Sequence, residues 1–288
     1  MEKSKPARQR IAITGGDGFI GSELMRQARA RGHVVEAVCR EAEVDIRNAA
    51  DVYTALEVAK PDVVIHLAAV SGPMVLAEHP DVVTSVNTVG TINVLEAARR
   101  IGNCRVILAS SVAGYSSGTE ECPLPASVYG VTKRFAELAG QHYCGEFGLS
   151  VTSVRIGSVY GPERQTDHVL HRMIHSAISR GEVSYESTGW EPLVHVTDCG
   201  RLLAALADVQ SWRPTYNAVT TPVSHRFLAE EVVRCLTDRN VSLRELGNGA
   251  ERWPLRFDSA GLLADTGLMP EMAAEAGIRD LVRARVAA

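Results

Sequence analysis

The stretch Arg10-Ile11-Ala12-Ile13-Thr14-Gly15-Gly16-Asp17-Gly18-Phe19-Ile20-Gly21 joins an apolar segment to a helical one through a loop rich in glycine. Its first five residues predict a short buried strand, because an apolar run bounded by glycine is typical of a strand. The segment 20–31 carries Leu24 and Ala28 at helical spacing and is ended by Gly32. The stretch therefore predicts a strand, a tight turn and a helix in that order.

The chain continues this alternation of strand and helix up to residue 160. Further strands are expected at 33–38, 62–68, 104–109 and 151–156, and helices at 49–59, 82–100 and 135–147. Apolar strands that alternate with helices are typical of a parallel sheet covered by helices on both faces. We therefore expect a doubly wound α/β fold, with a Rossmann domain over residues 10–160.

The two ends of the chain are expected to behave differently. Residues 1–9 carry several basic side chains and are expected to form a disordered tail. Beyond residue 160 the strict alternation is lost, and helices are expected at 169–179 and 199–208. Residues 161–288 are expected to form mainly a smaller α/β lobe that binds the substrate, with segments around 193–208 returning to the Rossmann core. Such a lobe would close over the carboxyl ends of the strands, where open α/β sheets bind ligands.

Composition disfavours two classes of partner. The chain has 288 residues and a formal net charge of -4, without the basic pattern of a nucleic-acid-binding protein. Its most apolar run, residues 63–70, is far shorter than the ~20 residues that span a bilayer. The 6 cysteines lack C-x-x-C spacing, which indicates reduced thiols. We expect a cytoplasmic protein that acts on a small molecule.

The glycine loop predicts a dinucleotide site. Gly15, Gly18 and Gly21 lie between a strand and a helix, where the missing side chains let backbone N–H groups approach a pyrophosphate. The helix N-terminus adds a partial positive charge. A turn that binds no ligand is the alternative, and the flanking strand and helix disfavour it.

The end of the second strand bears on the choice of cofactor. Proteins that prefer NAD usually offer a carboxylate there to the ribose hydroxyls, whereas this chain has Cys39 and Arg40. Arg40 is expected to hold a 2′-phosphate, so the sequence favours NADP, with NAD possible and a solvated arginine as the alternative. Asp45 and Ile46 are expected to flank the adenine, and for Asp45 a helix N-cap is the alternative.

An acid/base site is predicted by Tyr129-Gly130-Val131-Thr132-Lys133, which follows the pair Ser110-Ser111. Side chains four residues apart share one helix face, so the Lys133 ammonium can favour the ionised form of the Tyr129 phenol. Such a phenol suits proton transfer to a carbonyl or from an alcohol. The spacing alone also fits a packed ring beside a solvated charge. The order of glycine loop, serine pair and Tyr-Lys pair favours the catalytic interpretation.

Six motifs stand in a fixed order along the chain: TGGDGFIG (14–21), PDVVIHLAA (61–69), NTVGTINVLEAAR (87–99), the serine pair, YGVTK (129–133) and RIGSVYGP (155–162). Together they resemble the extended short-chain dehydrogenase/reductase family, of the NAD-dependent epimerase/dehydratase type. The likeness covers nearly the whole chain. It implies a nicotinamide cofactor and a carbohydrate substrate.

Within that family, the resemblance implies a role for each catalytic residue. Tyr129 is the general acid/base, Lys133 lowers the pKa of Tyr129 and grips the nicotinamide ribose, and Ser111 hydrogen-bonds the substrate oxygen. Ser111 aligns with the family's catalytic Ser or Thr, four residues before Tyr115, and Ser110 is the near miss.

Two sets of side chains are expected to contact ligands. The cofactor set is Thr14, Gly15, Gly18, Phe19, Ile20, Gly21, Arg40, Asp45, Ile46, Leu67, Ala68, Ala69, Asn87, Tyr129, Lys133 and Ile156. The substrate set is Ser71, Ser111, Val112, Tyr129, His168 and Arg256. Arg164 and Arg172 are candidates for pairing with an anionic substrate, with ordinary exposed charges as an equally good alternative.

The histidines are not expected to bind a metal. His168, His171 and His175 fall along one predicted helix face, but no acidic or cysteine neighbour completes a ligand set. His66 lies in an apolar strand and is expected to be a hydrogen-bonded core residue.

Two departures from the family pattern narrow the reaction. Sugar-nucleotide 4,6-dehydratases place an Asp-Glu pair after the catalytic Thr, whereas this chain has Val112-Ala113, which disfavours dehydration. Many nucleotide-sugar epimerases have an Arg-Asp pair where this chain has Glu191-Pro192, which weakens the case for a standard epimerase.

The subfamily signals are mixed. The short link over 40–46, the compact length and the segment 252–258 resemble the dTDP-4-dehydrorhamnose reductases, whereas the serine pair and residues 87–99 resemble the epimerases. We expect an NAD(P)H-dependent oxidoreductase that reduces a keto group of a sugar or sugar nucleotide, with the 4-keto group as the first candidate. A 4-epimerase with tightly bound NAD is the alternative, and a non-catalytic NADP-binding sensor is a lesser one. The resemblance also allows a homodimer through helices 82–100 and 135–147.

Overall fold

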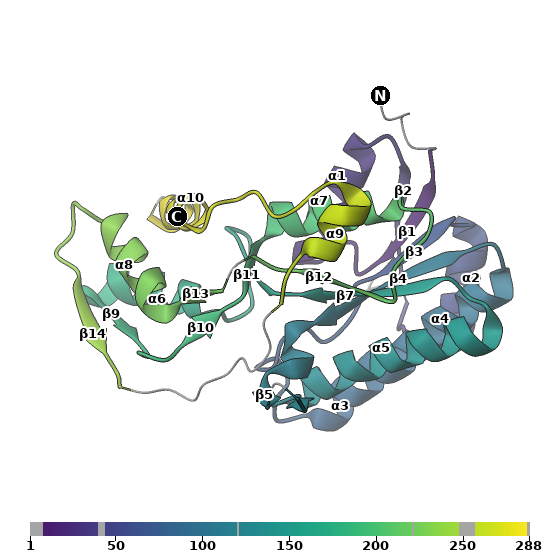
Figure 1. The fold of residues 1–288 in the computed structure, drawn as a ribbon, viewed down its shortest axis with the longest axis horizontal. Coiled ribbons are helices and arrows are strands. Elements are labelled where there is room, and N and C mark those ends of the chain that lie inside the picture. The colour runs from purple at the N-terminus through teal and green to yellow at the C-terminus, as the bar shows by residue number, and fades with distance from the viewer. Residues whose placement is uncertain (1–7, 40–43, 120, 221, 248–256, 287–288) are drawn as a thin grey trace.

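A parallel sheet forms the centre of the structure, a computed structural model that describes residues 8–39, 44–119, 121–220, 222–247 and 257–286 (Figure 1). Its strands have the order β12-β7-β4-β3-β1-β2. They are β1 (Arg10–Thr14), β2 (Val34–Val38), β3 (Val63–His66), β4 (Arg105–Ser111), β7 (Val151–Ile156) and β12 (Thr215–Ala218). The order reverses beside β1, so the loop after β1 borders the crevice in which doubly wound sheets bind ligands.

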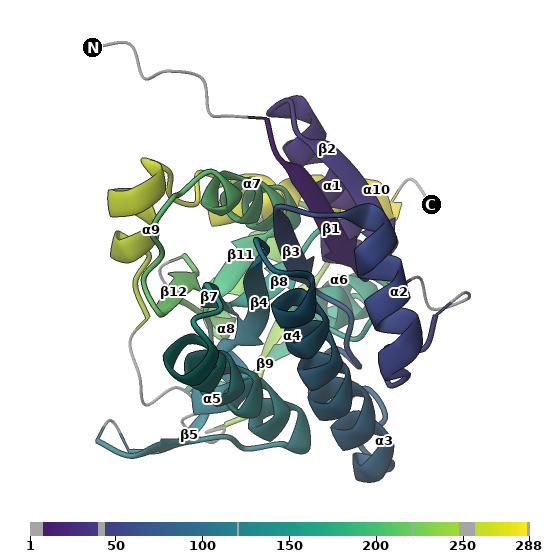
Figure 2. The same ribbon diagram turned by 90° about the vertical axis from the view of Figure 1, so that its right-hand side faces the viewer.

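Helices cover both faces of this sheet (Figure 2). One face carries α1 (Phe19–Ala30) and α7 (Val196–Ala207), and the other carries α2 (Ala49–Ala59), α4 (Gly90–Ile101) and α5 (Val128–Phe147). Successive side chains of a strand pack on opposite faces of the sheet. Val63 and Ile65 belong to the apolar cluster on one face, and Val64 belongs to the cluster on the other. The predicted doubly wound α/β fold is confirmed.

A smaller lobe lies beside the sheet (Figure 1). It contains α6 (Val169–Arg180), β9 (Glu182–Tyr185), α8 (His225–Arg234), β14 (Ser242–Glu245) and α10 (Ala274–Val286). Its core is separate from the two cores of the sheet and includes Leu170, Ile174, Leu228 and Ile278. Three more short strand pairs occur among the described residues: β8 (Ser158–Tyr160) with β11 (Leu193–His195), β10 (Trp190–Glu191) with β13 (Val223–Ser224), and β5 (Ser117–Gly118) with β6 (Pro123–Leu124). β11 leads directly into α7, which lies on the sheet.

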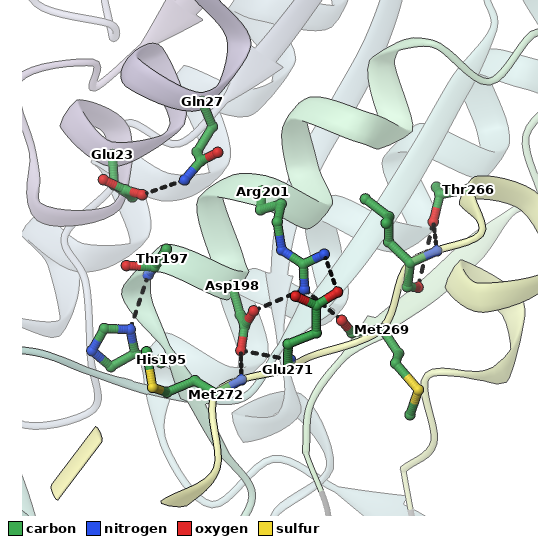
Figure 3. A network of polar contacts seen from close by, with 11 residues as sticks. Glu23, Gln27, His195, Thr197, Asp198, Arg201, Thr266, Met269, Glu271 and Met272 are labelled. Atoms are coloured by element: carbon green, nitrogen blue, oxygen red, sulfur yellow. Dashed lines mark hydrogen bonds and ion pairs between the residues drawn. The ribbon is translucent and has the colours of Figure 1, made fainter. Parts of the chain in front are cut away.

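The chain crosses from the sheet to the lobe once more near its C-terminus, between α9 (Ala260–Thr266) and α10. Asp198, buried at the start of α7, holds this crossing by accepting hydrogen bonds from the backbone N–H groups of Glu271 (2.9 Å) and Met272 (2.8 Å) (Figure 3). Arg201 adds an ion pair to Asp198 at 2.9 Å and donates to the Met269 carbonyl at 2.6 Å. Side chains of α7 therefore fix where the last helix of the lobe begins.

Several helix boundaries differ from those predicted. The predicted helix 82–100 is a continuous run of α3 (Pro80–Thr84), the π-helical turn η1 (Ser85–Val89) and α4. The predicted helix 135–147 begins at Val128, because the Ser127 hydroxyl caps it by accepting from the Gly130 N–H group. The helix predicted at 199–208 likewise begins at Val196, where the His195 ring caps it.

The outer surface of α5 is partly apolar. Val128, Val131 and Leu138 recur at helical spacing, and their exposed fractions are 39%, 53% and 59%. No helix within the described residues is both long and apolar enough to cross a membrane.

His66 is a buried core residue, as predicted. Its ring Nδ1 lies 2.7 Å from the Thr14 hydroxyl oxygen, and its Nε2 lies 3.3 Å from that of Thr91. Burial, together with the nearby charge of Lys133, lowers the pKa of His66 from 6.5 to about 3. His66 is therefore neutral in the folded protein at pH 7.

This buried ring predicts a loss of stability in acid. Between pH 6.5 and 3 the unfolded chain binds a proton that folded His66 does not, so the free energy of unfolding should decrease as the pH falls. The contribution amounts to about 2 kcal/mol at pH 5. His66→Asn should flatten the dependence of the melting temperature on pH between 7 and 5, whereas His142→Asn, on the exposed side of α5, should not. Equal slopes for all three proteins would contradict this assignment.

Candidate active site

The structure brings Ser111, Tyr129 and Lys133 together at the carboxyl end of β4. Ser111 is the last residue of that strand, and Tyr129 and Lys133 lie on successive turns of α5. The Lys133 Nζ atom lies 5.5 Å from the centre of the Tyr129 ring and donates to the Ala109 carbonyl at 2.9 Å. Ser111 and Lys133 are both buried. The three residues thus lie together at one end of the sheet, with Tyr129 only half-buried.

Burial dominates the titration of this site. It raises the pKa of the Tyr129 phenol, and hydrogen bonds from Ser111 and Ser71 and the charge of Arg164 oppose the rise. Burial also lowers the pKa of Lys133 to about 8. The expected lowering of the Tyr129 pKa is therefore wrong for this structure, because desolvation of the phenol outweighs its favourable contacts. Ser71, expected at the substrate, lies against the same hydroxyl.

The two adjacent serines have different partners. The Ser110 hydroxyl points into the protein and donates to Glu137 at 2.5 Å. The Ser111 hydroxyl contacts Tyr129 and accepts from the Ala113 N–H group at 3.1 Å, which caps the short helix η2 (Val112–Tyr115). Of the two, Ser111 is the serine that faces the tyrosine.

The glycine loop leaves the N-terminus of α1 open to a ligand. Gly18 is the N-cap of α1 and no side chain caps this helix. Gly15 has φ +70°, and a Cβ atom there would lie 2.8 Å from the Ala68 nitrogen. A Cβ atom at Gly21 would lie 2.1 Å from the Gly15 carbonyl oxygen. The backbone is packed so closely that only glycine fits at both positions, and the exposed N–H groups suit a pyrophosphate.

Residues of one helical turn and of two strand ends support this crevice. Asn87, in the π-helical turn, accepts from the Val70 N–H group at 2.8 Å and donates to the Thr132 hydroxyl at 3.0 Å, so it ties the loop after β3 to α5. Thr14 accepts from the Ala68 N–H group at 3.2 Å. Ile156 ends β7 and is buried. These residues surround the glycine loop and the Tyr-Lys pair.

Three expected residues are not placed at the site by the described part of the chain. Arg40 and Arg256 fall outside the described residues. Asp45 pairs with Arg47 at 2.5 Å, and Asn48 rather than Asp45 is the N-cap of α2, so the N-cap alternative for Asp45 is wrong. The choice between NADP and NAD therefore still depends on the sequence at Arg40.

His168 has a structural role in the lobe. It is buried, its Nδ1 atom accepts from the Leu170 N–H group at 3.1 Å as the N-cap of α6, and its Nε2 atom lies 2.9 Å from the Ser158 hydroxyl. Burial, with help from the charge of Arg164, holds the pKa of His168 well below 6.5. Both ring nitrogens are thus engaged within the protein rather than offered to a substrate.

A cavity of about 1190 Å³ opens between the glycine loop and the lobe. Its walls include Gly18 and Phe19 on one side and Arg164, Arg172 and Arg285 on the other. Arg164 is fixed by hydrogen bonds to the carbonyls of Val159 (2.6 Å) and Asp167 (3.0 Å), and Arg172 pairs with Asp167. Among the described residues, no group of three or more His, Cys, Asp or Glu side chains could hold a metal ion.

Comparisons with known proteins agree with this arrangement. The chain is 30% identical over 204 residues to the probable UDP-glucuronate 4-epimerase of Rhizobium meliloti (strain 1021), an alignment that covers 60% of this chain and 59% of that protein. It is 28% identical over 273 residues to a dTDP-4-dehydro-6-deoxy-D-allose reductase of Streptomyces sp, covering 82% of this chain and 84% of that protein. The chain thus spans less than two thirds of the length of the first relative.

One solved structure shares the fold of this chain over almost the whole length of both chains. The UDP-glucose 4-epimerase of Thermus thermophilus, in complex with NAD, superposes with a TM-score of 0.82 at 25% identity, covering 97% of this chain and 100% of that one. A sequence model of the NAD dependent epimerase/dehydratase family matches residues 11–218, which run from β1 to β12 and include the glycine loop, Ser111, Tyr129 and Lys133. The chain therefore belongs to the NAD dependent epimerase/dehydratase family.

Proposed function

We propose that the protein is an NAD(P)H-dependent oxidoreductase that reduces a keto group of a sugar nucleotide. The 4-keto group is the first candidate. The observation that carries this proposal is the grouping of Ser111, Tyr129 and Lys133 beside the end of β4, together with a glycine loop that suits a pyrophosphate after β1 of the same sheet. The reductase relative supports it, because that similarity extends over 82% of this chain.

The residues present fit a nicotinamide dinucleotide. The uncapped N-terminus of α1 and the close packing at Gly15 and Gly21 suit its pyrophosphate. When bound, the cofactor supplies a hydride to the carbonyl carbon. Tyr129 then donates its phenolic proton to the carbonyl oxygen, and Ser111 holds that oxygen by a hydrogen bond. Lys133 stabilises the phenolate left on Tyr129, which a second cation, Arg164, also favours.

The phenol of Tyr129 suits the role of proton donor. A proton donor must be protonated when the keto substrate arrives, as a phenol is at neutral pH, and burial favours the same neutral form. A 4-epimerase would use this group in both forms, first as the phenolate that takes a proton from the alcohol and then as the phenol that returns it.

The second candidate is a 4-epimerase that keeps NAD bound. The similarity to the probable UDP-glucuronate 4-epimerase favours it, and the same three residues would serve. The chain departs from the epimerase pattern at Glu191, which stands in place of the family's arginine and lies 3.3 Å from the His225 Nε2 atom.

The two candidates differ in their use of added cofactor. The purified protein would be mixed with NADPH or NADH and with 4-keto sugars linked to dTDP, UDP or GDP, and absorbance at 340 nm would be followed. The reductase predicts oxidation of the cofactor in proportion to the sugar consumed, faster with NADPH because of Arg40. NAD that copurifies with the protein, together with interconversion of UDP-glucuronate and its C4 epimer without net oxidation, would support the epimerase instead.

We further propose a homodimer through α5. The exposed Val128, Val131 and Leu138 form an apolar face that a second copy could cover. Light scattering should give a mass of about twice 31.0 kDa. Leu138→Glu should shift it to the monomer mass, whereas Val58→Glu, on exposed α2, should not. A monomer for the unaltered protein would contradict this proposal.

A further inference from the structure

Glu137 is a buried carboxylate one helical turn beyond Lys133 on α5. Its exposed fraction is 3%. It accepts hydrogen bonds from the Ser110 hydroxyl at 2.5 Å, the Tyr115 hydroxyl at 2.5 Å and the Arg155 guanidinium at 2.8 Å. The Arg155 Nε atom also donates to it, at 3.1 Å. Both oxygens of the carboxylate are thus engaged by the protein.

The partners of Glu137 come from the elements that carry the catalytic groups. Ser110 precedes Ser111 on β4, Tyr115 ends η2, and Arg155 pairs with Ser110 across β4 and β7. The Ser110 hydroxyl also lies 3.4 Å from the Lys133 carbonyl. Glu137 therefore ties the end of β4 to the turn of α5 from which Lys133 projects.

The position of the Lys133 ammonium depends on this link between β4 and α5. Its Nζ atom donates to the carbonyl of Ala109, the residue before Ser110. A shift of β4 relative to α5 would therefore move Ser111 away from Tyr129 and remove the acceptor of Lys133 together. Arg155 stiffens the junction, because its guanidinium lies 4.1 Å from the centre of the Tyr115 ring while that of Arg134 lies 4.3 Å from the same ring.

We propose that Glu137, acting through Ser110, is a positioning residue that sets the distances among Ser111, Tyr129 and Lys133 for the reaction. The assignment rests on the proposed function for its rate measurements, but not for its chemical-labelling measurement. Loss of the link should lower the rate constant of the chemical step more than it weakens ligand binding, because misplacement by about 1 Å can cost roughly 100-fold in rate.

The first test compares three variants of the full chain. Ser110→Ala removes the hydroxyl link and keeps the Glu137–Arg155 pair. Glu137→Gln keeps the shape and removes the charge. Glu231→Gln is the matched control, because Glu231 is also buried and pairs with an arginine, Arg234, but lies on α8 in the lobe. We expect kcat for keto-sugar reduction by NADPH to fall about tenfold in Ser110→Ala and roughly 100-fold in Glu137→Gln, with KM within about twofold.

The second test labels lysine amines and does not require turnover. The chain has four lysines, of which Lys133 is buried and Lys60 is exposed. Mass spectrometry after brief acetylation should show Lys133 modified at least about fivefold faster in Ser110→Ala and Glu137→Gln than in the unaltered protein, with Lys60 as the internal standard. Glu231→Gln should leave the ratio unchanged.

The outcomes separate the two proposals. If neither variant at β4 and α5 changes kcat by more than twofold or speeds Lys133 labelling, the positioning role is overturned, and Ser110→Ala decides this even if Glu137→Gln does not fold. If Ser110→Ala and Glu137→Gln lose no more rate than Glu231→Gln at the same melting temperature, the network would contribute only to the stability of the fold. If the unaltered protein oxidises no NADPH with any keto sugar, the proposed function fails while the labelling result still decides the role of Glu137.

Discussion

Tyr129→Phe should lower the rate of NADPH oxidation with a 4-keto sugar nucleotide by about 10²- to 10⁴-fold. The substitution removes only the hydroxyl that Ser111 and Ser71 contact, so the ring and its packing against Lys133 stay in place. Without that hydroxyl the nascent alkoxide has no proton donor of suitable pKa. Stopped-flow absorbance at 340 nm under single-turnover conditions would measure the chemical step directly.

The matched control for this prediction is Tyr143→Phe. Tyr143 lies on the same helix, is only partly buried, and its hydroxyl makes a long 3.5 Å contact with Glu96 away from the site. Its removal should leave both the rate and the affinity for NADPH unchanged. A Tyr129→Phe protein that binds NADPH normally and reduces the sugar at the unaltered rate would exclude every mechanism that uses the phenol.

Gly21→Ala should abolish tight cofactor binding. The added Cβ atom would lie 2.1 Å from the Gly15 carbonyl oxygen and 2.8 Å from the Gly16 Cα atom, both backbone atoms that cannot rotate away. The loop must then move, which misplaces the N–H groups at the start of α1. Loss of two charge-assisted hydrogen bonds at about 1.5 kcal/mol each corresponds to a Kd for NADPH raised roughly 100-fold. Fluorescence titration of NADPH would measure it.

Substitutions at two further glycines serve as controls for this experiment. A Cβ atom at Gly18 would meet only the Gly15 carbonyl oxygen, at 3.2 Å, so Gly18→Ala should weaken binding less than Gly21→Ala does. Gly145 lies on exposed α5 with nothing within 4 Å of its added Cβ atom, so Gly145→Ala should leave binding unchanged and stabilise the helix by up to about 1 kcal/mol. Unaltered NADPH affinity in a folded Gly21→Ala protein would contradict the assignment of the loop.

Local sequence patterns were sufficient for much of the sheet. The helix over 49–59 and the strand over 151–156 have the predicted bounds, because their periodicity is strong and their ends carry clear stop signals. By contrast, α5 begins seven residues before the predicted start at 135. Gly130 in its first turn disfavours a helix, and the Ser127 cap that offsets it becomes evident only once the chain is folded.

The same limit applies to the candidate site. The sequence predicts that Ser111, Tyr129 and Lys133 act together, since Tyr129 and Lys133 are four residues apart on a helix and the family resemblance implies Ser111; the structure does bring the three together. The Glu137 network cannot be predicted from local patterns, because its members come from four elements, although Glu137 itself falls at helical spacing after Tyr129 and Lys133. The role of His168 as a helix cap and the desolvation that raises the pKa of Tyr129 likewise depend on tertiary packing.

The most direct test of the central claim is the fate of an isotopic label. NADPH carrying deuterium at both C4 positions of its nicotinamide would be incubated with the protein and a 4-keto sugar nucleotide, and the product examined by NMR and mass spectrometry. The account predicts one deuterium on the carbon of the former keto group and one NADP⁺ formed for each sugar, with both products formed about 10²- to 10⁴-fold more slowly by Tyr129→Phe. A C4-epimerised sugar that contains no deuterium, formed without oxidation of the added NADPH, would contradict it.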